Sequence, residues 1–63
     1  MSDPFVPHIG DKVRHKNGGA PWLVLEVAFD PARREMVIAR REAGEVIEGV
    51  RLIDEYEIVE LAR

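Results

Sequence analysis

Few residues in this chain are of a type that could carry out chemistry. His8 and His15 are the only imidazoles, and Asp3 and Asp11 lie near them in the sequence. Imidazoles and carboxylates bind metals, but two histidines seven residues apart across a turn match no familiar ligand spacing. We therefore predict no metal site and interpret both histidines as solvated, one on a tail and one on an exposed strand.

Nucleophilic catalysis also lacks candidates. The 63 residues include one Ser, one Asn and one Tyr, with no Thr, Gln or Cys. Ser2 lies in the N-terminal segment, where nothing holds it rigidly against a base. We predict no catalytic residue and no cofactor. The absence of Cys, of a signal pattern and of an apolar run of about 18 residues predicts a cytoplasmic protein without membrane contact.

Side chains that could bind a partner gather between residues 10 and 27. A short basic strand carries three cations, and a glycine loop and the single tryptophan follow it. A tryptophan there is either part of the core or a platform for recognition. The predicted binding residues are Lys12, Arg14, Lys16, Asn17, Gly18, Gly19 and Trp22.

The basic strand has two interpretations. With Arg33, Arg34, Arg40 and Arg41 it could form one face that binds single-stranded nucleic acid, with bases stacked on Trp22. However, residues 1–41 hold seven Lys or Arg against five Asp or Glu, whereas residues 42–63 hold two against seven. Since the net charge is −3 and a nucleic-acid domain is usually basic, we favour strand faces of opposite charge that pair in a sheet.

Turn residues divide the chain into strands. Gly and Asn tolerate positive φ and Asp-Pro opens a turn, so reversals are predicted at residues 10–11, 17–21, 30–34 and 42–45. Strands are predicted over 12–16, 22–29, 35–41, 46–53 and 58–61, with a 3₁₀ turn at 54–57. We predict an all-β fold, a small barrel of about five antiparallel strands over residues 9–63. Residues 1–8 form a flexible tail, from which Phe5 or Val6 docks on the barrel.

Two glycines receive specific predictions. Gly44 is expected to take a positive φ in the third reversal. Gly49 interrupts the fourth strand and is expected to mark a bulge or a sharp bend at a barrel corner.

The second strand is apolar on both faces. Leu23, Leu25, Val27 and Phe29 share one face, and Trp22, Val24 and Ala28 share the other with only Glu26 charged. Either a bulge near Glu26 turns both sets inward, or the second face meets another copy of the chain. Because so short a chain has little core, we predict self-association as a homodimer or higher oligomer through the second face.

The pattern Gly10-Asp11-x-Val13-x-x-Lys16-x-Gly18-Gly19 before an apolar strand resembles the opening of the YodC-like small bacterial proteins. The resemblance covers roughly residues 9–61 and implies an SH3-like barrel of unassigned function. The chain departs from the family by placing Ala20 before Pro21, where a proline usually follows the glycine pair directly. The loop is therefore expected to differ in shape.

A weaker resemblance rests on Gly10, Asp11, Val13, Arg14 and Trp22, which are similar to the opening of the plasmid-borne type II dihydrofolate reductases. That family builds one pore from four SH3-like subunits, lined by a Val-Gln-Ile-Tyr motif and a lysine.

The positions matching that pore are Val50-Arg51-Leu52-Ile53 and His15. Only the valine is kept, so no catalytic residue is carried over. The leading function is a non-catalytic binding module for an unknown protein partner, which it contacts through loop 17–21, Trp22 and the basic strand. The alternatives are an oligomeric NADPH-dependent reductase and a weak nucleic-acid-binding barrel.

Overall fold

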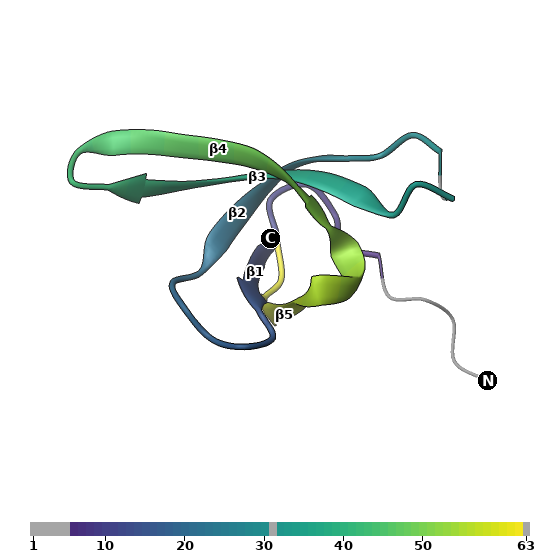
Figure 1. The fold of residues 1–63 in the computed structure, drawn as a ribbon, viewed down its shortest axis with the longest axis horizontal. Coiled ribbons are helices and arrows are strands. Elements are labelled where there is room, and N and C mark those ends of the chain that lie inside the picture. Colours follow the sequence, from purple (N-terminus) through teal and green to yellow (C-terminus); the bar gives the residue numbers. More distant parts are fainter. Residues whose placement is uncertain (1–5, 31, 63) are drawn as a thin grey trace.

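The computed structural model describes residues 6–30 and 32–62, which form a single sheet of five antiparallel strands. The strand order is β4-β3-β2-β1-β5 (Figure 1). The elements are β1 (Lys12–His15), β2 (Trp22–Val27), β3 (Glu35–Glu42), β4 (Glu45–Leu52), the 3₁₀ turn η1 (Ile53–Glu55) and β5 (Tyr56–Glu60). The predicted all-β fold with a 3₁₀ turn before the last strand is confirmed, and the predicted ends differ by at most two residues.

The hairpin of β3 and β4 is the longest paired segment. Pairing runs without a shift from Glu35 opposite Leu52 to Glu42 opposite Glu45. Ala43 and Gly44 close it with φ values of +53° and +83°, which two-residue turns of type I′ require. The positive φ predicted for Gly44 is confirmed. Since β2 pairs with β3 only as far as Ala39, the turn end of the hairpin projects beyond β2 (Figure 1).

A β-bulge in β2 settles which of its residues face the core. Val24 pairs with Ile38 and Glu26 pairs with Val37, so Leu25 is an extra residue. The extra residue moves Val27 to the side that Val24 already faces, and both contact the core. The predicted bulge near Glu26 is therefore confirmed, but it does not turn both apolar sets inward, because Leu23 and Phe29 remain exposed.

The oligomer interface predicted through Trp22, Val24 and Ala28 needs correction. Val24 is 1% exposed inside the core, and Trp22 packs against the same cluster. These two side chains are thus used within one chain and are not free to bury a second copy.

The bulge predicted at Gly49 does not occur. Gly49 lies opposite Ile38 in uninterrupted pairing. A Cβ at this position would lie 2.7 Å from Nη1 of Arg51, so the missing side chain leaves room for the Arg51 guanidinium to lie over the strand.

The core draws residues from four strands and η1. The buried cluster consists of Val13, Val24, Met36, Ile38, Ile53 and Tyr56, with Trp22, Val27 and Ile58 packed against it. Among the described residues, β4 contributes no member to this cluster. The strand is therefore held chiefly by its pairing with β3.

The carboxylate of Asp11 joins the two ends of the folded chain. Asp11 is 2% exposed, and its Oδ2 and Oδ1 accept hydrogen bonds from the backbone N–H groups of His8 (2.9 Å) and Ala62 (2.7 Å). Pro7 is also buried, so folded contacts begin before residue 9. Val6 lines a small hollow with Val27, whereas Phe5 lies outside the described residues.

These hydrogen bonds also affect protonation. The N–H of His8, followed by that of Ala62, holds the pKa of Asp11 below its ordinary value, while burial opposes the shift. The carboxylate is therefore ionised at neutral pH despite its burial.

We expect Asp11→Ala to destabilise the fold by about 3 kcal/mol, because two backbone N–H groups lose their charged acceptor and each such loss costs about 1–3 kcal/mol. Asp11→Asn keeps one acceptor oxygen and should cost about half as much. Urea unfolding at pH 7, followed by Trp22 fluorescence, measures both. An Asp11→Ala variant within about 0.5 kcal/mol of wild type would show that the tie is dispensable.

Wild type and Asp11→Asn together also test the protonation of Asp11. A lowered pKa means that the unfolded chain binds more protons in acid, so this part of the stability is present above about pH 4 and is lost as the pH falls through the folded pKa. The difference between wild type and Asp11→Asn should shrink from pH 7 to pH 2.

Relief of backbone strain should stabilise the hairpin. Ala43 has a positive φ, which costs an L-residue with a Cβ about 1–2 kcal/mol, and asparagine tolerates this conformation better. Ala43→Asn should raise the free energy of unfolding by about 0.5–1 kcal/mol in urea melts. Ala20→Asn is the matched control, since Ala20 is exposed but has no positive φ, and it should leave stability unchanged. Equal effects of the two substitutions would contradict a turn-specific gain.

Candidate functional site

The glycine loop is shaped by two consecutive residues with positive φ. Gly18 and Gly19 have φ values of +108° and +107°, and no atom beyond the adjoining residues lies within 4 Å of a Cβ built on either. The requirement for glycine is therefore conformational. The N–H of Gly18 donates to the carbonyl of His15 (2.8 Å), and the N–H of Asn17 donates to His15 Nδ1 (3.0 Å). The chain reverses here as predicted.

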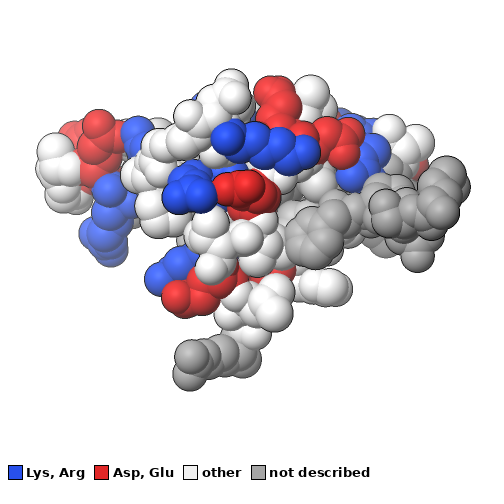
Figure 2. All heavy atoms as spheres, turned by 90° about the horizontal axis from the view of Figure 1, so that it is seen from below, with Lys and Arg blue, Asp and Glu red and all other residues white. Residues whose placement is uncertain are grey.

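The basic strand β1 lies against the acidic strand β5. Arg14 Nη2 lies 2.8 Å from Glu57 Oε2, and Lys12 Nζ lies 3.6 Å from Glu60 Oε1. This is the predicted pairing of strand faces of opposite charge. Figure 2 shows positive and negative side chains interspersed over the face that it presents, not one broad basic field.

Trp22 stands beside a hollow of about 330 Å³ at the loop end of β2. The hollow is lined by Lys12, Ala20, Pro21, Trp22, Leu23, Ala39, Arg40 and Arg41. The Arg40 guanidinium carbon lies 4.5 Å from the Trp22 ring centroid, and that of Arg51 lies 6.0 Å away. Because the ring also packs on the core, Trp22 supports the base of the projecting hairpin.

Only two of the seven predicted binding residues reach this hollow. They are Lys12 and Trp22, whereas Arg14 turns to Glu57 on β5. The remaining predicted residues, which do not line the hollow, are Lys16, Asn17, Gly18 and Gly19. Sequence reasoning had named Arg40 and Arg41 only as members of a broader basic face.

The histidines lie in different surroundings. His8 is exposed, while the ring of His15 meets that of Tyr56 edge to face with centroids 5.2 Å apart. Within residues 6–30 and 32–62, no three His, Cys, Asp or Glu side chains gather as a metal site. The same part of the chain contains no helix with the length and apolar character needed to cross a bilayer.

The sheet carries an apolar surface on the side away from the core cluster. Successive residues of a strand point to opposite sides, so the neighbours of Val24, Met36 and Ile38 face outward. Cross-strand partners share a face, which extends this side onto β4. We call it the outer face; it comprises Leu23, Glu26, Glu35, Val37, Ala39, Arg41, Val46, Glu48, Val50 and Leu52.

The outer face is unusually exposed for its composition. Leu23, Val46, Val50 and Leu52 keep 41 to 56% of their surface accessible. An apolar surface of this kind rimmed by charges usually marks an interaction site. Alternation along β4 places Val46, Val50 and Leu52 on one side with Glu48, but alternation alone does not show that this side faces away from the core.

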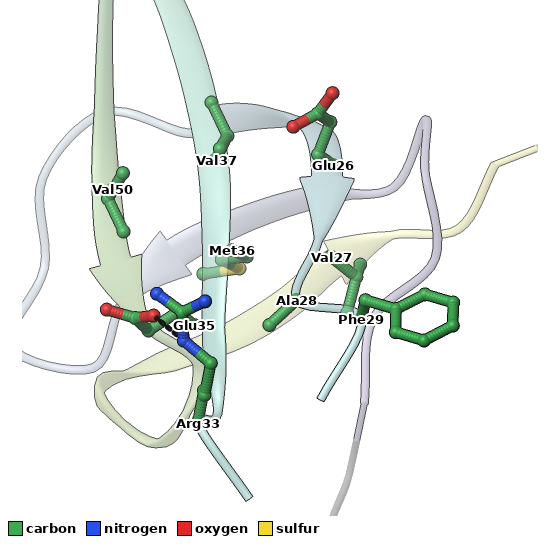
Figure 3. Close-up of a pocket in the computed structure, with 9 residues that line it drawn as sticks. All are labelled: Glu26, Val27, Ala28, Phe29, Arg33, Glu35, Met36, Val37 and Val50. Carbon is green, nitrogen blue, oxygen red and sulfur yellow. Dashed lines mark ion pairs between the residues drawn. The ribbon is translucent and has the colours of Figure 1, made fainter. Parts of the chain in front are cut away.

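One end of the outer face is hollowed, with a volume of about 340 Å³ (Figure 3). Val37 and Val50 come to it from neighbouring strands, and Glu35 pairs there with Arg33 at 2.9 Å. The Phe29 ring at its margin points away from the other lining residues and is fully exposed.

The loop beside this hollow is fixed to η1. Arg34 has a φ of +51°, and its guanidinium donates to both carboxylate oxygens of Asp54 at 2.6 to 3.1 Å. This hydrogen bonding lowers the pKa of Asp54 and raises that of Arg34. The Arg34 carbonyl also accepts the Ile53 N–H at 2.8 Å, so Arg34 is held to η1 by both its side chain and its backbone.

Comparison of the chain with protein-family models, curated proteins and solved structures finds no match. The site must therefore be judged on its own geometry. Sequence reasoning missed Phe29, which it placed within the second strand; β2 in fact ends at Val27. The available signal was the Asp-Pro pair directly after Phe29, which opens a turn.

We expect Trp22→Ala to cost about 2–3 kcal/mol, because a half-buried ring that packs on the core and carries Arg40 is lost. Trp22→Phe keeps a ring and should cost about 1 kcal/mol. Urea unfolding followed by circular dichroism is suitable, because the variants lack the tryptophan signal. The fully exposed Phe29 provides the control, and Phe29→Ala should be neutral within about 0.5 kcal/mol. A neutral Trp22→Ala would mean that the ring is a free platform for recognition.

Proposed function

We propose that this chain is a non-catalytic protein-interaction module, built as an SH3-like barrel, that binds its partner through the outer face. The observation that carries the proposal is the row of exposed apolar side chains on that face, Val46, Val50 and Leu52 on β4 and Leu23 on β2. These four side chains expose apolar area although the chain has only a small core to bury. Covering such area stabilises a complex by about 25 cal/mol per Å² before the cost of association is subtracted.

The charges favour a protein over a nucleic acid as the partner. The cations of β1 are paired with Glu57 and Glu60, so they offer less attraction to a phosphate backbone. The outer face mixes three glutamates and one arginine with its apolar residues, and Glu48 lies between Val46 and Val50 on the edge strand β4. A mixture of exposed apolar side chains and both signs of charge is typical of a protein interface.

The strand order and the 3₁₀ turn before β5 support the SH3-like barrel implied by the resemblance. Barrels of this type host many unrelated functions, so the fold alone does not name the partner. The surface chemistry carries that part of the proposal.

Affinity capture from a bacterial lysate tests the role of the outer face. Bait at about 1 µM should enrich a defined set of proteins, and Val50→Asp should lose them because it removes an exposed apolar side chain and adds a second carboxylate beside Glu48.

Val59→Asp is the matched control. Val59 is a strand valine with 44% exposure, but it lies on β5. It should capture the same set as wild type. If Val50→Asp captures that set unchanged, or if wild type enriches nothing over a blank matrix, the proposal fails.

A further inference from the structure

The charges of the outer face are arranged unevenly along β3. Arg41 lies on this face near the turn end of the hairpin, and Glu35 lies on it at the opposite end. Six residues at about 3.3 Å each separate them, which is about 20 Å. Arg33 pairs with Glu35, but Glu26 lies at the same end and leaves it negative. The face thus has a positive end at Arg41 and a negative end at Glu35 and Glu26, with apolar residues and Glu48 between them.

A surface of this kind is complementary to itself in one orientation. If two copies stack face to face with their strands antiparallel, the positive end of each copy meets the negative end of the other. A two-fold axis at the level of the Ile38 and Gly49 pair would set Arg41 opposite Glu35 of the second copy, twice. The parallel orientation would oppose Arg41 to Arg41 and Glu35 to Glu35, which is repulsive.

The apolar residues obey the same two-fold relation. On β4, Val46 would face Leu52 of the second copy, because Val46 pairs with Arg41 and Leu52 pairs with Glu35. On β3, Ala39 would face Val37 of the second copy. The exception is Val50, which would face Glu48 of the second copy; Glu48 lies on the edge strand β4, where its long side chain can reach water. The other apolar pairs and the charged ends agree on one axis.

We propose that a second copy of this chain binds to the outer face. This proposal rests on the proposed role of that face in binding a protein. Two copies stack with antiparallel strands to form a symmetric dimer, in which the Arg41 to Glu35 contacts set the orientation. Stacked sheets lie about 10 Å apart, which allows their side chains to interdigitate.

The size of the face sets the expected strength. Three strands about 4.8 Å apart, of which β3 and β4 are eight residues long, give a face of at most about 14 by 26 Å. This is smaller than the roughly 800 Å² per partner of a standard stable interface. The dimer should therefore be weak, with a Kd of about 0.1–1 mM.

Sedimentation equilibrium of the purified chain from 20 µM to 2 mM tests the proposal. Wild type should shift from monomer toward dimer over this range. Arg41→Glu alone and Glu35→Arg alone should each associate at least tenfold more weakly, because both contacts become repulsive. An equimolar mixture of the two variants should recover association, because each mixed dimer holds two favourable contacts.

Lys16→Glu is the matched control, since it makes the same charge change on an exposed cation outside the outer face, and it should dimerise like wild type. Circular dichroism of each variant establishes that it is folded. Three results would overturn the proposal: a wild type that stays monomeric at 2 mM, single variants that dimerise as well as wild type, or a mixture that fails to recover. If the dimer formed through the edge of β4 instead, the single variants would dimerise as well as wild type.

If sedimentation shows no dimer, the affinity-capture test of the foreign partner still stands, because the bait at about 1 µM is monomeric in either case. Failure of the capture experiment alone would instead remove the foreign partner and leave the second copy as the occupant.

Discussion

One extra residue in β2 determines which surfaces of this protein are inside and which are outside. With a strict two-residue alternation, Val24 and Val27 would point to opposite sides of the sheet. The bulge at Leu25 brings both to the core. A chain of 63 residues has few apolar side chains to spare, so it gains a core here at the cost of one unpaired residue. The opposite side of the sheet keeps its apolar residues as an exposed face.

The second constraint is the lack of disulfide cross-links. The chain has no cysteine, and its ends are joined by the buried Asp11 carboxylate, which accepts two backbone N–H groups. A buried charge is tolerable only when it is hydrogen-bonded, and here each of its two oxygens has an N–H donor. The Arg34 to Asp54 contact joins the residue before β3 to η1 in a similar way at the surface. Short polar ties thus take the place of the disulfides that small domains often need.

The turns were predictable because their residues dictate backbone conformation locally. Gly18, Gly19 and Gly44 take the positive φ values that their residue type permits, and the strand ends follow within two residues. The pairing of strand faces of opposite charge, found between β1 and β5, could also be predicted, because the two halves of the sequence differ in charge.

Features that depend on contacts between distant segments could not be predicted from the sequence. The sequence of β2 fits either a bulge or an intermolecular face, and only its register against Ile38 and Val37 distinguishes them. Asp11 looked like a turn residue because its partner Ala62 lies 51 positions away. Gly49 looked like a bulge because the Arg51 side chain that covers it cannot be placed from sequence alone.

The same separation in sequence orders the assembly of the sheet. The β3–β4 hairpin closes around two residues, whereas β1 and β5 can pair only when the two ends of the chain meet. The entropy of closing a loop grows with its length, so the hairpin is the natural early event and the β1–β5 seam the late one. A fusion partner attached at either end would therefore pull on the seam that closes last. One inserted between Ala43 and Gly44 would instead interrupt the turn from which assembly begins.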